Sequence, residues 1–177
     1  AGCTGIVNPK SRLTLGDALE AGDAIVLLAS SGIHANGLSL ARELAKRLPG
    51  GLLERLPDGT SFGDALLTPT PLYAPVTEAL HRAGVTPHYA ANITGHGWRK
   101  LMRHPKALGY RIEQVPPVPA VLDFIRREAA MSDEDAYGTF NMGAGFALYV
   151  AASDARRTVE VARACGVDAW VAGRVEA

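Results

Sequence analysis

The sequence predicts a layered α/β domain, and two features of its pattern lead to that prediction. Short apolar runs typical of buried strands alternate along the chain with segments whose apolar residues repeat at helical spacing. The chain has 177 residues, which is long enough to bury most of its apolar surface, and neither an internal repeat nor a linker divides it. We therefore expect one domain over residues 1–177.

The first strand and helix are expected near the N-terminal end. The run AIVLLA at Ala24–Ala29 is typical of a strand that is buried on both faces. A helix should follow, because Asn36 is a suitable N-cap and apolar residues recur three and four apart between Leu38 and Leu48. Pro49 and the two glycines after it should end this helix, and a turn is expected at 57–59.

The alternation continues to the end of the chain. Ser132 and Asp135 have the spacing of a capping box. The expected order is helix 73–83, strand 88–94, a short helix from 97, strand 109–115, helix 118–129, a short helix from 132, strand 145–152, helix 153–166 and strand 168–175.

Composition and charge exclude several classes of protein. Lys and Arg number 18, as do Asp and Glu, so the chain has no general attraction for nucleic acid or for an anionic membrane. No apolar run is long enough to span a bilayer, and the first residues lack the pattern of a signal peptide. The chain begins without Met, so we expect a processed protein or part of a longer one. Cys3 and Cys165 fit no metal or redox spacing, and we expect free thiols in a reducing, cytoplasmic compartment.

Three turns beside predicted strands are rich in glycine and small polar residues. They read SSGIHANG at 30–37, NITGHG at 92–97 and TFNMGAG at 139–145. Glycine lets the backbone approach a ligand closely, and free N–H groups at a helix start attract anions, so a phosphate is the natural ligand. Ordinary turn and cap chemistry explains one such turn, whereas three together favour a binding site. We expect the first two to lie close together, because ligands in layered α/β proteins gather where strand ends meet helix starts.

A basic cluster follows the second turn. Arg99, Lys100 and Arg103 would suit a clamp for a phosphate or carboxylate, and the alternative is a solvated helix face. The five histidines lack the spacing of metal ligands, so no metal site is expected. No Walker loop, nucleophile elbow or complete dinucleotide fingerprint occurs in the chain, which leaves those enzyme classes without support.

Four strings of the sequence resemble landmarks of one enzyme family. AGDAIVLLASSGIHANGLSLAR, LLTPTPLY, NITGHG and TFNMGAGFALYV are similar, in family order, to aminoimidazole ribonucleotide synthetase, also called phosphoribosylformylglycinamidine cyclo-ligase. TFNMG beside SSGxHxNG is the discriminating feature. Related ATP-using enzymes share the architecture but usually lack that string; they include thiamine-monophosphate kinase, selenophosphate synthetase, the hydrogenase maturation protein and formylglycinamidine ribonucleotide synthetase.

The resemblance implies a fold and a reaction. This chain would be the C-terminal domain, with α-helices packed on a mixed β-sheet, of a homodimeric enzyme whose subunit has two α/β domains. In the family reaction, ATP phosphorylates the formyl amide oxygen of formylglycinamidine ribonucleotide, and an amidine-side nitrogen then closes the imidazole ring and expels phosphate. ATP and Mg²⁺ would bind mostly to the N-terminal domain, which this chain lacks. The chain alone is therefore not expected to bind Mg·ATP or to catalyse the reaction.

The resemblance also implies which residues face the ribonucleotide, although it identifies no catalytic residue. Here the second turn carries Asn92 and His96 where the family commonly has His and Gly, and the segment after it is more basic. Two alternatives therefore stay open, a non-catalytic module that binds a phosphorylated metabolite or a partner protein, and a related enzyme that acts on another phosphate ester. The implied substrate-binding residues are Ser30, Ser31, Gly32, His34, Asn36, Gly37, Thr94, Gly95, His96, Gly97, Asn141 and Gly143.

Overall fold

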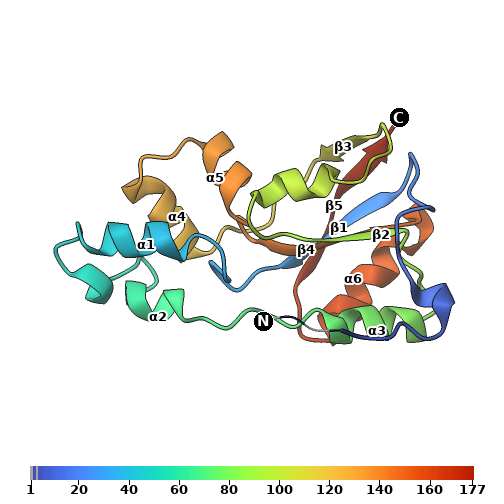
Figure 1. Ribbon diagram of the computed structural model, residues 1–177, viewed down its shortest axis with the longest axis horizontal. Coiled ribbons are helices and arrows are strands. Elements are labelled where there is room, and N and C mark those ends of the chain that lie inside the picture. The colour runs from blue at the N-terminus through green and yellow to red at the C-terminus, as the bar shows by residue number, and fades with distance from the viewer. Residues whose placement is uncertain (1, 3) are drawn as a thin grey trace.

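The computed structural model describes residues 2 and 4–177, so Cys3 lies outside the described residues (Figure 1). Its strands are β1 (Ala24–Ala29), β2 (Tyr89–Asn92), β3 (Gly109–Ile112), β4 (Ala144–Val150) and β5 (Ala169–Glu176). The α-helices are α1 (Leu38–Ala45), α2 (Phe62–Leu66), α3 (Ala74–Arg82), α4 (Ala120–Glu128), α5 (Asp133–Thr139) and α6 (Ala155–Ala164). Short 3₁₀ helices are η1 (Lys10–Arg12), η2 (Gly51–Leu53), η3 (Gly97–Met102) and η4 (Ala152–Asp154).

The strands form one five-stranded sheet in the order β2-β4-β1-β5-β3. The layered α/β class is confirmed, but the expectation of a mixed sheet is wrong, because all the strand pairings are antiparallel. The reason lies in the path of the chain. After β1 ends at Ala29, the chain passes through α1 to α3, the edge strands β2 and β3, and α4 and α5, and it then enters β4 at Ala144, the residue paired with Ala29. Because the first residue of β4 lies beside the last residue of β1, the two strands run in opposite directions.

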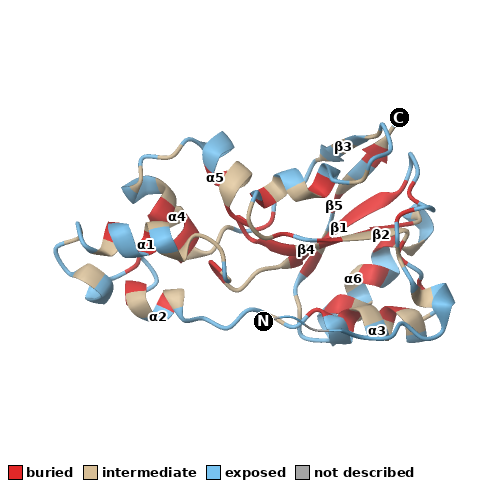
Figure 2. Ribbon diagram, viewed as in Figure 1, coloured by how far each residue is buried: buried red, intermediate tan, exposed pale blue. Residues whose placement is uncertain are grey.

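The central strands β1 and β4 are buried on both faces, whereas the edge strand β3 is partly exposed (Figure 2). On one face Val26 and Leu28 of β1 pack with residues of α3 and α6. On the other face Ile25 and Leu27 pack with Leu101 of η3 and with neighbouring loops. Ala24 to Leu28 are all buried, as the uninterrupted apolar run predicts.

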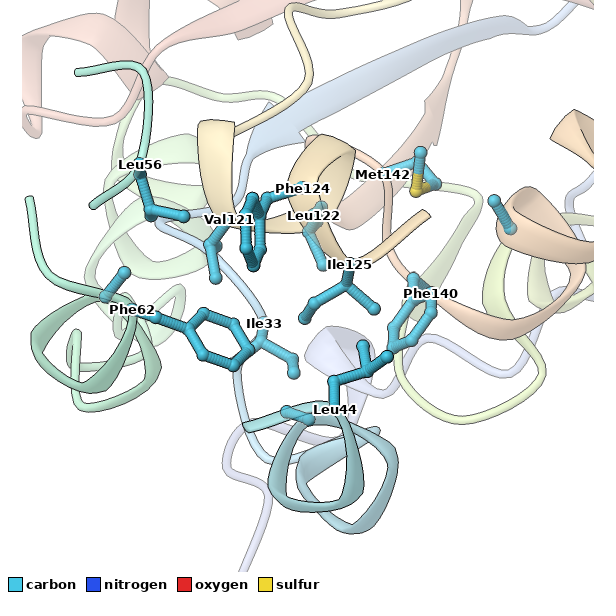
Figure 3. Close-up of a cluster of buried hydrophobic side chains, with 13 residues drawn as sticks. Ile33, Leu44, Leu56, Phe62, Val121, Leu122, Phe124, Ile125, Phe140 and Met142 are labelled. Atoms are coloured by element: carbon cyan, nitrogen blue, oxygen red, sulfur yellow. The ribbon is translucent and has the colours of Figure 1, made fainter. Parts of the chain in front are cut away.

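A third core lies beyond the end of the sheet and contains no strand residue (Figure 3). We call the part of the protein that surrounds this core the helical lobe. It consists of α1, α2, α4 and α5 and the loops directly next to them. Its centre is formed by large side chains that are almost fully buried: Ile33, Leu44, Leu56, Phe62, Val121, Leu122, Phe124, Ile125, Phe140 and Met142.

Several local predictions can be compared with the structure. The capping box is confirmed, since the Asp135 N–H donates to Ser132 Oγ at 3.1 Å and Ser132 Oγ donates to Asp135 Oδ2 at 2.7 Å. The Asn36 cap is wrong. Gly37 is the N-cap of α1 with φ +89°, and the Asn36 amide donates instead to the Thr139 carbonyl at 2.7 Å.

Helix α2 was not expected, and Ser61 caps it by accepting from the Asp64 N–H at 3.1 Å. Cys165 is exposed, and the expectation of free thiols stays a prediction, because Cys3 lies outside the described residues. Within the part of the chain that the structure describes, no helix is long and apolar enough to cross a membrane.

Candidate functional site

The three glycine-rich turns meet at one end of the sheet. Ser30 N–H, just after β1, donates to the Gly143 carbonyl before β4 at 2.9 Å, and Ile93 N–H, just after β2, donates to the Gly145 carbonyl at 2.9 Å. The prediction that the first two turns lie close together is confirmed. The third turn joins them because β4 runs antiparallel to both β1 and β2, so its first residues pair with their last ones.

A cavity of about 140 Å³ lies between these turns. It is smaller than the roughly 300–1,000 Å³ of pockets that enclose a drug-sized ligand, so it suits one end of a metabolite. Residues of all three turns line it: Ile33, His34, Ala35, Asn36, Ile93, Thr94, Gly95 and Asn141.

His34 is held as a neutral ring. Its Nε2 accepts a hydrogen bond from the Ser31 N–H at 3.2 Å, which assigns the proton of the neutral ring to Nδ1. Burial lowers the pKa of His34 from its ordinary value, because the charged form loses hydration. No hydrogen bond among the described residues uses Nδ1. His34 therefore brings an uncharged N–H donor to the cavity wall.

Tyr73 lies next to the site, on the same glycine as His34, and sequence reasoning missed it. Its hydroxyl donates to the Ala29 carbonyl at 2.7 Å, its ring stacks on Phe146 at 5.2 Å, and burial raises its pKa well above the usual range. A Cβ added at Gly145 would overlap the Tyr73 hydroxyl and lie 2.7 Å from His34 Cε1. Gly145 thus lets both rings pack on β4. Tyr73 is the last residue of the string LLTPTPLY, and Gly145 is the last residue of TFNMGAG. These family-like strings were the signal by which the two residues could have been found.

Asn141 connects the first turn, the third turn and η3, the short helix that follows the second turn. Its amide donates to the Gly32 carbonyl at 2.8 Å and its Oδ1 accepts from the Gly143 N–H at 3.1 Å. Its carbonyl accepts from Trp98 Nε1 of η3 at 2.7 Å. Because the side chain is only 3% exposed and its bonds lie within the protein, Asn141 acts first as a positioning residue.

Asn36 and Gly95 lie next to each other in the cavity lining. Since the Asn36 amide nitrogen is bonded to Thr139, its Oδ1 is left as an acceptor. A Cβ at Gly95 would lie 3.1 Å from that oxygen, which is tighter than an ordinary contact. The missing side chain at Gly95 therefore leaves Asn36 Oδ1 accessible.

The basic cluster is only partly at the cavity. Lys100 Nζ donates to Oγ1 of Thr94 at 3.0 Å. Arg99 is exposed, and its guanidinium lies against Gly138 of α5. Arg103 is exposed as well. The structure thus brings one of the three predicted clamp residues to a cavity-lining side chain.

The other predicted residues lie around the cavity without lining it. Gly37 and Gly97 have positive φ, and a Cβ at either would overlap Phe140 or the carbonyls of Tyr137 and Phe140, so both serve packing. Ser31 Oγ donates to the Pro69 carbonyl at 2.7 Å. Contact with a ligand stays a prediction for every one of the implied residues, those that line the cavity included, and the following lie outside its lining: Ser30, Ser31, Gly32, Gly37, His96, Gly97 and Gly143.

Backbone strain concentrates in the same turns. His34, His96 and Met142 have positive φ, and Ala130 is the one other non-glycine residue of the described chain that does. Such conformations cost about 1–3 kcal/mol each and persist only where the surroundings enforce them, often at ligand sites.

The cavity does not fit a metal ion. Its lining includes no carboxylate, whereas Mg²⁺ binds through carboxylates and phosphates. Throughout residues 2 and 4–177, no three His, Cys, Asp or Glu side chains gather where they could hold a metal.

Comparison with known proteins shows to which family the chain belongs. The family described as AIR synthase related protein, C-terminal domain, matches residues 20–177. The chain belongs to this family. It is 38% identical over 178 residues to the phosphoribosylformylglycinamidine cyclo-ligase of Methanococcus vannielii, with 99% of this chain and 50% of that protein covered. It is 37% identical over 178 residues to the cyclo-ligase of Nitrosococcus oceani, covering 98% of this chain and 48% of the relative. The chain thus spans about half the length of the curated relatives it matches.

A solved structure shares the fold. The Escherichia coli hydrogenase maturation protein HypE superposes with a TM-score of 0.58 and 19% identity, over 91% of this chain and 46% of that one. At this identity the likeness concerns the fold alone.

Proposed function

We propose that this chain is the substrate-side half of an ATP-dependent phosphoribosylformylglycinamidine cyclo-ligase in purine biosynthesis. The observation that carries the proposal is the cavity at which three turns of the family's landmark strings converge. Family membership and the names of the relatives support it.

The cavity suits binding and orientation of a polar metabolite. His34 Nδ1 supplies an N–H donor, Asn36 Oδ1 an acceptor and Thr94 a hydroxyl. In the proposed reaction these groups would hold one end of formylglycinamidine ribonucleotide while the formyl amide oxygen is phosphorylated and the ring closes. Buried Ile33 and Ile93 would exclude water beside it.

The ATP side is proposed to lie elsewhere. Since the cavity offers no carboxylate for Mg²⁺, we assign ATP and its metal mostly to a preceding ATP-binding domain, in the same chain or in a separate one. The relatives are about twice as long as this chain, which leaves room for that domain. We further propose that the complete enzyme is a cytoplasmic homodimer, whose subunit includes residues 1–177 as one domain.

Calorimetric titration with formylglycinamidine ribonucleotide tests the proposal. The 177-residue chain should bind it, and Asn36→Ala should weaken binding by roughly tenfold or more, because a buried acceptor contact is lost. Gln114→Ala, which removes an exposed amide far along the chain, should bind as the wild type does. Thermal unfolding of each variant checks that it is folded.

Activity completes the test. Adding the preceding domain, ATP and Mg²⁺ should yield aminoimidazole ribonucleotide, whereas the chain alone should not hydrolyse ATP. Binding of another phosphate ester in preference to the ribonucleotide would contradict the proposed substrate. Binding without activity in the complete protein would favour a non-catalytic module.

A further inference from the structure

Lys100 differs from the other cations of this protein in its surroundings. Of all the Lys and Arg residues, only Arg12, Lys100 and Arg126 are partly buried, and the others are exposed. Arg12 pairs with Glu78 at 3.2 Å and Arg126 with Asp123 at 2.9 Å. Among the described residues, no carboxylate lies within ion-pair distance of Lys100. It is the one partly buried cation left without a counter-charge.

The protein partner of Lys100 is a neutral hydroxyl. Lys100 Nζ has three N–H donors, and one of them is used by Thr94 Oγ1 at 3.0 Å. Because this oxygen accepts from the ammonium group, the hydroxyl hydrogen of Thr94 remains free to donate. Thr94 lines the cavity, and the lining contains neither Asp nor Glu. Two donors, one of them charged, therefore stand at the same edge of a cavity that has no negative charge.

A partly dehydrated cation without an anion is unfavourable, and a bound anion would remove that cost. We propose that Lys100 and Thr94 form an anion subsite at the edge of the cavity, which takes a phosphate group of the ligand. The proposal rests on the proposed function only for the identity of that ligand. The phosphate then lies at Lys100, and the uncharged part of the ligand reaches toward His34 and Asn36.

The two neighbouring arginines are not part of the proposed subsite. Arg99 and Arg103 are exposed, and neither makes a hydrogen bond to a residue that lines the cavity. An exposed guanidinium contributes little to anion binding, because water and salt screen it. The effect of charge removal should therefore be confined to Lys100.

Equilibrium titration of a matched pair of variants tests the subsite. Lys100→Met removes the charge and keeps the length of the side chain, and Lys10→Met makes the same change at an exposed lysine of η1. The probes are inorganic phosphate and ribose 5-phosphate. Lys100→Met should weaken binding of both by roughly 10- to 100-fold, as expected for a lost charge-assisted hydrogen bond, and Lys10→Met should not. Added salt should weaken phosphate binding to the wild type more than to Lys100→Met.

ATP as a third probe separates the two sources of a phosphate. A larger loss for ribose 5-phosphate than for ATP assigns the subsite to the sugar phosphate, and the reverse assigns it to the nucleotide. Lys100→Arg restores the charge and should recover part of the affinity that Lys100→Met loses. If Lys100→Met lost affinity only because it misfolds, restoring the charge would not be expected to recover it.

Unchanged phosphate affinity in Lys100→Met, or no phosphate binding by the wild type, would overturn the subsite. Failure of this inference differs from failure of the proposed function. If the ribonucleotide binds equally well to wild type and Lys100→Met, the subsite is wrong and the function stands. If phosphate binds through Lys100 but the ribonucleotide does not bind, the subsite stands and the function is wrong.

Discussion

The sheet and the helical lobe are stabilised by separate cores, and the cavity lies where the two meet. β1 is buried between α3 and α6 on one face and η3 on the other, whereas the core of the helical lobe contains no strand residue. The turn after β1 and the turn before β4 carry the chain between them. The sheet and the helical lobe thus hold the strained turns from both sides, and the geometry of the cavity depends on how these two parts pack together.

The largest expected effect comes from Phe140, which is 1% exposed and belongs to the core of the helical lobe. Phe140→Ala should lower the free energy of unfolding by about 3–5 kcal/mol, through lost burial and the cavity left behind. Urea denaturation measures it. Leu53→Ala, at a side chain that is 79% exposed, should change it by less than about 0.5 kcal/mol.

Hydrogen exchange on Phe140→Ala tests whether the helical lobe opens separately from the sheet. Amides of α1, α4 and α5 should exchange faster by a larger factor than those of β1 and β4, if the helical lobe opens separately. Equal acceleration in the sheet would show that the two cores unfold as one unit.

Gly97→Ala tests how η3 packs on the helical lobe. Gly97 has φ +52°, and a Cβ there would overlap the carbonyls of Tyr137 and Phe140. We expect a loss of about 2 kcal/mol or more in unfolding free energy. Gly59 has φ +83° with open space around it, so Gly59→Ala reports the backbone strain alone. If the two variants lose equal stability, the contact between η3 and α5 contributes nothing.

His34 should make stability depend on pH at the junction. Because its pKa is lowered in the folded state, the unfolded chain binds more protons below about pH 6.5, and stability falls as the pH falls through that range. The difference in unfolding free energy between wild type and His34→Asn should shrink from pH 7.5 to 5. The slope cannot exceed about 1.36 kcal/mol per pH unit, because one imidazole binds at most one proton, and solvent screening of the half-buried ring reduces the effect further. A difference that grows on acidification would contradict a neutral His34.

The smallest effect on stability is expected at Gly95. Its φ lies outside the left-handed region, so Gly95→Ala should change the free energy of unfolding by less than about 0.5 kcal/mol. The added Cβ would nevertheless crowd Asn36 Oδ1, and affinity for the ribonucleotide should drop. Titration and denaturation of the same variant decide the point. A loss of stability with unchanged affinity would show that Gly95 serves the turn rather than the ligand.

The sequence predicted the strands, most of the helices and the first two turns as neighbours, because these features depend on local patterns. It missed what depends on distant partners. Asn36 looked like a helix cap, yet its amide bonds to Thr139, 103 residues away in the chain. Tyr73 looked like a helix-face residue, yet it bonds to Ala29 and packs beside His34.

What the sequence alone determined is the order of elements, the buried central strand, the capping box and the family, since composition, periodicity and motif strings are properties of the chain itself. The antiparallel sheet, the separate core of the helical lobe and the selection of Lys100 from three neighbouring cations were decided by the tertiary structure. Strand direction depends on where the chain re-enters the sheet, and burial of a charge depends on which segments pack around it. Neither quantity exists until residues far apart in the chain are brought into contact.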